Sequence, residues 1–209
     1  MTLSVVLVDY GIGNIHSVEK ALVRAGAEVQ RTGDANEIRR ASRLVLPGVG
    51  AFADCARALA TRGLSEPVRE YALSGRPFLG ICVGMQLLFS ESEEFGRCPG
   101  LGVIPGRVVA IRPRAGLKIP QIGWNRVRPA GGSDWKGTPL ARLAPGAMMY
   151  FVHSFSAEPD EEESRLADAT YGDQRVTAAV RRNATYGLQF HPEKSGEAGL
   201  SVLGEFLAA

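Results

Sequence analysis

The stretch PFLGICVGMQLL, residues 77–88, decides how the rest of the chain is interpreted. It begins as a short apolar run typical of a buried strand, and its second half predicts an apolar helix that continues through Phe89. Between the two, Gly80 and Gly84 flank Cys82 in the Gly-x-nucleophile-x-Gly pattern of a sharp strand-to-helix turn, with Cys in place of Ser. Such a turn brings neighbouring backbone close, so a side chain at either glycine would clash.

This turn makes Cys82 a candidate nucleophile. Its side chain would project at the carboxyl end of a strand, above the first turn of a helix. The unpaired N–H groups and positive dipole end found there favour a thiolate and a developing oxyanion. A buried structural cysteine is the alternative interpretation, because that is the usual role of a free cysteine. The pattern alone leaves both open.

Length and charge restrict the class of protein. The chain has 209 residues, enough for a sizeable core, and we expect residues 1–209 to form one domain. A net charge of +2 gives no electrostatic reason to expect nucleic acid as a partner. No apolar run approaches the ~20 residues of a membrane helix. The start, residues 1–6, lacks a basic segment and predicts a first strand, not a signal peptide.

Cysteines and histidines indicate the compartment. The three cysteines are odd in number and have no metal-ligand spacing: Cys55, Cys82 and Cys98. This predicts free thiols in a reducing, cytoplasmic setting. The three histidines are scattered, so we expect no zinc site and no bound metal: His16, His153 and His191.

The order of apolar runs predicts an α/β fold. Strand-like segments at residues 3–9, 27–31 and 43–46 alternate with helical spacing, and Asn14 is available to cap the first helix. This alternation predicts an open, mostly parallel sheet flanked by helices. After Glu91, short strand-like runs dominate, and residues 171–174 predict a hairpin turn. We therefore expect added antiparallel strands in the second half.

The second decisive stretch is YGLQFHPEKS, residues 186–195. His191 and Glu193 are two apart at the end of a predicted strand, so both side chains can point the same way. Pro192 cannot donate to a ladder, which suits a strand end. A cysteine on a sharp turn, a histidine able to take its proton and a carboxylate able to orient that histidine would form a nucleophilic triad. Considered alone, the tripeptide HPE fits a solvent-facing loop better.

Together these motifs resemble the class I (triad) glutamine amidotransferases. GICVGMQ at residues 80–86 and QFHPE at 189–193 carry the resemblance. Further segments resemble the glutaminase subunits of imidazole glycerol phosphate synthase, an enzyme of histidine biosynthesis: DYGIGN at 9–14, PGVGAF at 47–52, GWN at 123–125, YFVHS at 150–154 and HPEKS at 191–195. One departure is Gln121, where many relatives have His; it leaves the triad intact.

The resemblance implies a flavodoxin-like fold and the hydrolysis of L-glutamine to glutamate and ammonia. Cys82 would attack the carboxamide carbon, His191 would pass the thiol proton to ammonia, and Glu193 would hold the imidazole tautomer. The implied oxyanion hole combines the N–H of Val83 with one from Val49 or Gly50. Since glycines at 48 and 50 let that loop change conformation, the free subunit could be idle and the complex active.

Four residues are candidates for holding the amino and carboxylate groups of glutamine: Gln86, His153, Ser154 and Phe155. For Gln86, a capping or solvent contact is an equally good interpretation. For His153, an ordinary hydrogen-bonded strand position is favoured over a catalytic role.

Ammonia needs an acceptor, and this chain leaves no room for a second domain to hold one. The resemblance implies a (β/α)8-barrel cyclase subunit as partner, which would make imidazole glycerol phosphate and an aminoimidazole carboxamide ribotide. Asn14 and Trp124 lie in the motifs expected near the docking face, although Trp124 could equally pack in the core. The chemistry implies no cofactor.

Three other functions compete. The chain could serve another synthase, such as those making anthranilate, GMP or pyridoxal phosphate, although residues 9–14 and 123–125 speak against this. It could act alone as a γ-glutamyl hydrolase-like enzyme or a cysteine peptidase. It could also be a scaffold that has lost its activity, which an intact Cys82, His191 and Glu193 disfavours.

Overall fold

A computed structural model of the chain describes residues 3–209, so the part of the first-strand prediction that falls on Met1 and Thr2 lies outside the described residues. The helices are α1 (Ile15–Arg24), α2 (Ala35–Arg40), α3 (Phe52–Thr61), α4 (Ser65–Leu73), α5 (Val83–Gln86) and α6 (Gly196–Ala208). The strands are β1 (Leu3–Val8), β2 (Ala27–Thr32), β3 (Leu44–Gly48), β4 (Phe78–Cys82), β5 (Phe89–Ser92), β6 (Cys98–Pro99), β7 (Ile104–Ala110), β8 (Gln121–Pro129), β9 (Ala147–His153), β10 (Phe155–Pro159), β11 (Arg165–Tyr171), β12 (Gln174–Arg182) and β13 (Thr185–Leu188). Two 3-10 turns cover Glu162–Ser164 and Pro192–Lys194.

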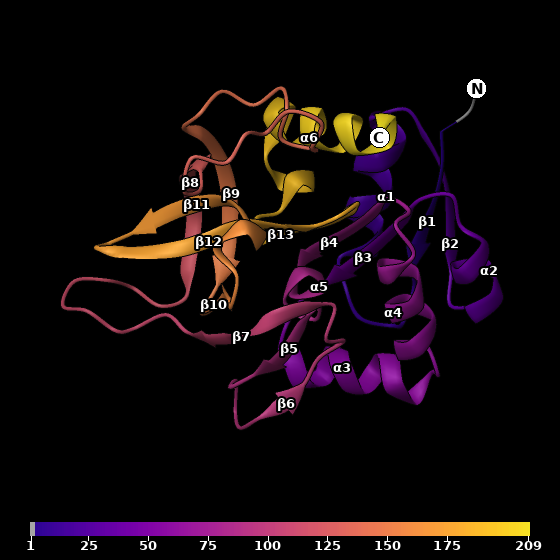
Figure 1. Cartoon of the computed structure of the whole chain (residues 1–209), viewed down its shortest axis with the longest axis horizontal. Helices are drawn as coiled ribbons and strands as arrows, with labels where there is room; N and C mark the ends of the chain where they lie inside the picture. Colours follow the sequence, from indigo (N-terminus) through magenta and orange to yellow (C-terminus); the bar gives the residue numbers. More distant parts are fainter. Residues whose placement is uncertain (1–2) are drawn as a thin grey trace.

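A nine-stranded sheet in the order β2-β1-β3-β4-β13-β12-β11-β8-β9 forms the centre of the molecule (Figure 1). From β2 to β13 neighbouring strands are parallel, and from β13 to β9 they are antiparallel. A separate four-stranded sheet has the order β10-β7-β5-β6. The predicted α/β fold with added antiparallel strands is confirmed, as is the hairpin turn, where Tyr171 pairs with Gln174.

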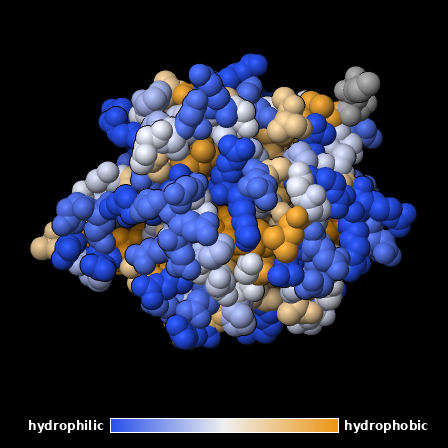
Figure 2. All heavy atoms as spheres, viewed as in Figure 1, coloured by the Kyte–Doolittle hydropathy of each residue, from blue (hydrophilic) through white to orange (hydrophobic). Residues whose placement is uncertain are grey.

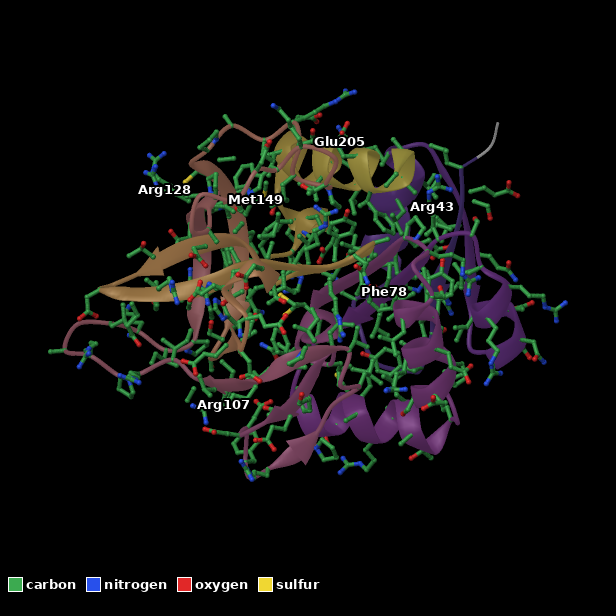
Figure 3. All side chains as sticks on the ribbon, viewed as in Figure 1. Arg43, Phe78, Arg107, Arg128, Met149 and Glu205 are labelled. Atoms are coloured by element: carbon green, nitrogen blue, oxygen red, sulfur yellow. The ribbon has the colours of Figure 1, made fainter. Side chains whose placement is uncertain are left out.

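Helices cover both faces of the parallel half. α1 and α6 pack against each other on one face, and α2, α3 and α4 lie on the other (Figure 1). Phe78 on β4 and Met149 on β9 are fully buried, whereas Arg107 and Arg128 point outward at the periphery (Figure 3). The face seen in Figure 2 is largely hydrophilic, with small apolar groups showing between charged side chains. Among residues 3–209, no helix is long and apolar enough to span a membrane.

The strand-to-helix turn forms as predicted, but its helix is short. β4 runs directly into α5, which ends at Gln86 instead of continuing through Phe89. The carbonyls of Leu87 and Leu88 accept hydrogen bonds from the amides of Leu101 and Val103, at 2.7 and 2.8 Å. The chain then pairs as β5 with β7 and β6. Backbone partners that are remote in sequence therefore override the helical spacing of the apolar residues.

Glycines are required at the turn because three backbone segments meet there. A Cβ on Gly80 would lie 2.6 Å from the carbonyl oxygen of Gly84, and one on Gly48 would lie 2.6 Å from the Gly84 nitrogen. A Cβ on Gly84 would overlap the carbonyl oxygen of Leu46. Since every clashing atom belongs to the backbone, no side-chain rotation could relieve these contacts. The end of β3, the end of β4 and the first turn of α5 thus interlock.

We predict that Gly84→Ala lowers the free energy of unfolding by about 3 kcal/mol or more, because the backbone of β3 must move to admit the methyl group. Gly204→Ala is the matched control: Gly204 lies within α6, where a Cβ meets nothing within 4 Å. That variant should be neutral or more stable by up to about 1 kcal/mol. Urea denaturation followed by circular dichroism measures both, and equal effects would contradict the interlocked turn.

Candidate active site

A cavity of about 380 Å³ opens at the carboxyl ends of β3 and β4, where Gly48 pairs with Cys82. Ligands of open α/β sheets bind outside this edge. Both Cys82 and His191 line the cavity. So does every residue predicted for the oxyanion hole or for glutamine binding: Val49, Gly50, Val83, Gln86, His153, Ser154 and Phe155. Four further residues that were not predicted for the site also line the cavity: Glu94, Pro120, Val152 and Lys194.

Cys82 has an unusual backbone conformation, with φ 55° and ψ −114°. A non-glycine residue in this region is strained by about 1–3 kcal/mol and persists only where its surroundings fix it. Its side chain is buried apart from the contact with the cavity. The sulfur lies 3.9 Å from the carbonyl oxygen of Val152 and 3.7 Å from Nε2 of Gln189. The turn therefore points a thiol at a polar site.

His191 and Glu193 meet beside this thiol. Nδ1 of His191 lies 2.8 Å from Oε1 of Glu193, and the two side chains are 5% and 1% exposed. They were expected to share one side of a strand end, but β13 ends at Leu188 and a 3-10 turn at Pro192–Lys194 brings them together. β9 holds this turn: the amide of His191 donates to the carbonyl of Tyr150 at 2.9 Å.

Ser195 connects the two segments a second time. Its hydroxyl donates to the carbonyl of His191 at 2.6 Å and accepts from the amide of Tyr150 at 3.0 Å. With both backbone groups of Tyr150 used, the histidine is fixed to an edge strand from the antiparallel half of the sheet. Ser195 belongs to the HPEKS motif, which predicts no separate role for its hydroxyl.

The environment sets the charge of His191. Burial by itself lowers the pKa of the ring, but the neighbouring Cys82 sulfur and the hydrogen-bonded Glu193 carboxylate outweigh burial and raise the pKa to about 9. At neutral pH the imidazole therefore holds a proton. Oε2 of Glu193 is buried without a hydrogen-bond partner among the described residues, so Oε1 alone is engaged, with the ring.

Two buried side chains that do not line the cavity hold the end of β3 and the loop that follows it. The hydroxyl of Tyr10 donates to the carbonyl of Pro47 at 2.7 Å, and the thiol of Cys55 donates to the carbonyl of Val49 at 3.4 Å. In a trans peptide the C=O and the next N–H point in opposite directions. The Gly50 N–H therefore points away from buried Cys55. Gly50 has φ +84°, a conformation that favours glycine.

Glu94 closes the other side of this loop. Its Oε2 accepts the amide of Phe52 at 2.6 Å, and the side chain still lines the cavity. A carboxylate at a cavity wall offers an acceptor for an ammonium group. No sequence motif indicated this role, because Glu94 lies in the acidic stretch 91–94 and reaches the site only through the β5–β6 connection.

A buried polar network backs the cavity. Nδ1 of His153 lies 2.8 Å from the carbonyl oxygen of Phe155, and its Nε2 lies 3.0 Å from the side-chain amide of Gln121. Burial, together with the nearby charge of His191, lowers the pKa of His153 to about 4 despite the hydrogen bond to Phe155. The ring is therefore neutral at pH 7, as expected for a hydrogen-bonded strand residue.

The two candidates for the partner face lie outside the cavity. Trp124 is 53% exposed on β8, so the alternative of core packing is wrong. Asn14 occupies the N-cap position of α1, as expected, but its side chain makes no capping hydrogen bond. Instead the carbonyl of Asn14 accepts from the amides of Ser17 and Val18.

The fold and the site define a class of proteins. The family model "Glutamine amidotransferase class-I" matches residues 6–208, and the chain belongs to that family. The solved structure of PurLQS from Thermotoga maritima superposes with a TM-score of 0.76 at 20% identity, covering 100% of this chain and 99% of that one. A structure titled as a glutamine amidotransferase has a TM-score of 0.72 at 21% identity. These two likenesses show the fold.

Within that class, the sequence matches one kind of subunit. The Legionella pneumophila (strain Lens) protein named imidazole glycerol phosphate synthase subunit HisH 1 is 48% identical, over 98% of both chains. The Geobacter metallireducens subunit HisH is 46% identical over 97% of both chains, and the Gloeobacter violaceus one is 45% identical over 99% of this chain and 89% of its own. The chain belongs to this HisH family.

The raised pKa of His191 predicts a pH-dependent stability. Because the folded-state value of about 9 lies above the ordinary 6.5, the stabilisation is complete below pH 6.5 and lost as pH rises through 9. Cys82 and Glu193 share this shift, so we expect the free energy of unfolding of the native chain, relative to Glu193→Gln, to fall between pH 6.5 and 9.5 by a part of the roughly 3 kcal/mol that the whole shift represents. Urea titrations at several pH values measure this difference.

Glu197→Gln is the control for that comparison, since Glu197 pairs with Arg24 at the surface with both side chains mostly exposed. Its stability should follow the native chain at every pH. Parallel curves for the native chain and Glu193→Gln would show that the carboxylate does not hold the imidazole proton.

Proposed function

We propose that this chain is the glutaminase subunit of an imidazole glycerol phosphate synthase: a single domain over residues 1–209 that hydrolyses L-glutamine to glutamate and ammonia in the cytoplasm, without a cofactor. The observation that carries the proposal is that a thiol on a strained turn, Cys82, and a protonated imidazole, His191, line one cavity, with the buried carboxylate of Glu193 paired to the imidazole from behind. Membership of the HisH family supports the same activity.

In the proposed mechanism, the sulfur of Cys82 attacks the side-chain carboxamide carbon of glutamine. The proton that the thiol has given to His191 passes to the nitrogen, the C–N bond breaks, and ammonia leaves a glutamyl thioester. Water then attacks the thioester, with His191 taking its proton, and glutamate departs as the C–S bond breaks. Glu193, 2.8 Å from Nδ1, holds the ring with Nε2 toward the sulfur.

The negative oxygen of each tetrahedral intermediate needs donors. We assign this role to the backbone N–H of Val83, which follows the nucleophile, and to the N–H of Val49 or Gly50. Gly50 is the better candidate, because the carbonyl of the same peptide is held by Cys55 on the opposite side. Each such donor is worth about 2.7–4 kcal/mol in comparable enzymes. A loop conformation that turns it away would reduce the rate about 10²–10³-fold.

The head group of glutamine carries one positive and one negative charge. Glu94 offers a carboxylate that can accept a hydrogen bond from the ammonium group of the substrate. Oε1 of Gln86 receives no hydrogen bond from the described residues, so it can accept another hydrogen bond from the same ammonium group. The backbone of Ser154 and Phe155, together with His153, forms the facing wall. Lys194 at the same cavity can neutralise the substrate carboxylate.

The proposed partner is a (β/α)8-barrel cyclase that uses the ammonia to form imidazole glycerol phosphate and an aminoimidazole carboxamide ribotide. Support comes from exposed apolar residues that continue from the cavity along β8 and β9: Ile122 is 62% exposed, Trp124 53% and Met148 40%. Ile122 pairs with Val152, which lines the cavity, and Trp124 pairs with Tyr150. Large exposed apolar residues in one patch mark an interaction surface.

Asn14 lies in the loop after β1, which borders the cavity end of β3. It follows Gly13, where a Cβ would lie 3.5 Å from the Pro47 ring, so the loop 9–14 borders the loop after β3. We place Asn14 at the edge of the docking face on this basis. Contact there would let a partner act on the loop that carries Gly50.

We predict that Cys82→Ala lowers glutamine hydrolysis more than about 10³-fold, because the substitution removes the nucleophile. Glutamate release is measured for each variant alone and with the cyclase and its nucleotide substrate. Cys98→Ser is the matched control, since Cys98 lies outside the cavity, and it should keep full activity. Substantial turnover by Cys82→Ala would contradict the assignment of the nucleophile.

Trp124→Ala in the same assay tests the partner. The triad is untouched, so basal activity without cyclase should equal that of the native chain, while stimulation by the cyclase should fall at least about tenfold. Sedimentation velocity measures the complex directly. A native chain that turns over at full rate without any partner would favour a glutaminase acting alone.

A further inference from the structure

Gln189 lies behind the proposed nucleophile and has no role in the mechanism above. It is fully buried, two residues before His191, and does not line the cavity. Its Nε2 nevertheless lies 3.7 Å from the sulfur of Cys82, within reach of an N–H···S hydrogen bond. The contact therefore comes from inside the protein and leaves the cavity side of the sulfur free for substrate.

The orientation of this amide is fixed by a chain of hydrogen bonds that starts at a backbone carbonyl. The carbonyl of Phe155 can only accept, so the Gln86 side chain must turn its NH₂ group toward it, at 3.3 Å. The same NH₂ group also donates to Oε1 of Gln189, at 3.0 Å. With its oxygen so occupied, Gln189 must present its own NH₂ group to the sulfur.

We propose that Gln189 is a catalytic residue, a permanent hydrogen-bond donor that stabilises negative charge on the Cys82 sulfur, and that Gln86 is the positioning residue that orients it. The proposal rests on the proposed role of Cys82 as nucleophile. A buried polar side chain keeps its hydrogen bonds because losing one is costly, and a bond to a charged group is stronger than one between neutral groups.

The donor acts at two points of the reaction. Before attack, it favours the thiolate over the thiol. During hydrolysis of the thioester, the C–S bond breaks and its electron pair returns to sulfur, where the Gln189 N–H stabilises it. By then His191 has given its first proton to ammonia. The imidazole can therefore stabilise the sulfur in both steps, attack and thioester cleavage, only if it is protonated again in between. An amide does not titrate and supplies the same donor throughout.

Several titratable groups surround the sulfur and would be unchanged in a Gln189 variant. They follow β13, follow β1, lie on α3 or lie at the cavity walls: in that order, His191, Glu193 and Lys194, then Tyr10, then Cys55, then Glu94 and His153. A change that follows replacement of Gln189 by an uncharged side chain is therefore due to the lost donor.

The test is the rate of Cys82 alkylation by iodoacetamide as a function of pH, followed by mass spectrometry of the peptide that contains Cys82. Gln189→Glu keeps the shape and the bond from Gln86 but places an oxygen at the sulfur. We expect the pH midpoint of alkylation to rise by about one unit and the rate at pH 7 to fall about tenfold, the factor expected for one hydrogen bond to a charged group. Gln30→Glu, the same change at an exposed position on β2, should leave the curve unmoved.

Gln189→Met, similar in volume and uncharged, is the second variant in case a buried glutamate prevents folding. It should also move the midpoint upward, and Gln86→Met should do so by a smaller amount because Gln189 loses its orientation. An unshifted curve for folded Gln189→Met would overturn the proposal. The assay measures the alkylation rate of the Cys82 thiol and not the turnover of glutamine. A native chain without glutaminase activity would therefore count against the proposed function, while the alkylation curves would still test the hydrogen bond from Gln189.

Discussion

The close approach of three backbone segments, through Gly48, Gly80 and Gly84, is the constraint on which the site depends. These contacts leave no space for a Cβ and hold the turn between β4 and α5 in one conformation. Cys82 is carried at φ 55° as a consequence, in a conformation that costs about 1–3 kcal/mol and that a less constrained chain would relax. Packing of the two strands and the first helical turn thus provides the energy that presents a thiol at the edge of the sheet.

Strands β13 and β9 position His191 at the same sheet edge as the thiol of Cys82. β13 lies parallel to β4, with Leu188 beside Ile81, so the chain that leaves β13 emerges at the same sheet edge as the thiol. β9, at the far edge of the same sheet, then fixes His191 through both backbone groups of Tyr150. A histidine more than a hundred residues away is delivered by sheet topology, and the same strand continues outward into the apolar patch proposed for the partner.

The fold class, the strand-to-helix turn and the proximity of His191 to Glu193 were predictable because each depends on local pattern: apolar strands, glycines at fixed spacing, and a histidine and carboxylate two residues apart. The candidates for the oxyanion hole and for glutamine binding rested on the family resemblance instead. Features whose cause is remote in sequence were not predicted. α5 stops at Gln86 because the segment that follows it pairs with strands remote in sequence, Phe89 with Ile104 and Glu91 with Pro99. Glu94 reaches the cavity through a connection that no motif marks. Gln189 had one signal, a lone polar residue in an apolar strand run.

The proposed function requires the sulfur of Cys82, held by the strained turn, to lie beside a protonated His191 in a site that accepts glutamine. Mass mapping after reaction with a chloroketone analogue of glutamine, in the presence of the cyclase, tests it most directly. We expect one adduct, on Cys82, which excess L-glutamine prevents and His191→Ala slows severely. An adduct on Cys55 or Cys98 in its place, or labelling of Cys82 that is indifferent to both glutamine and His191, would contradict it.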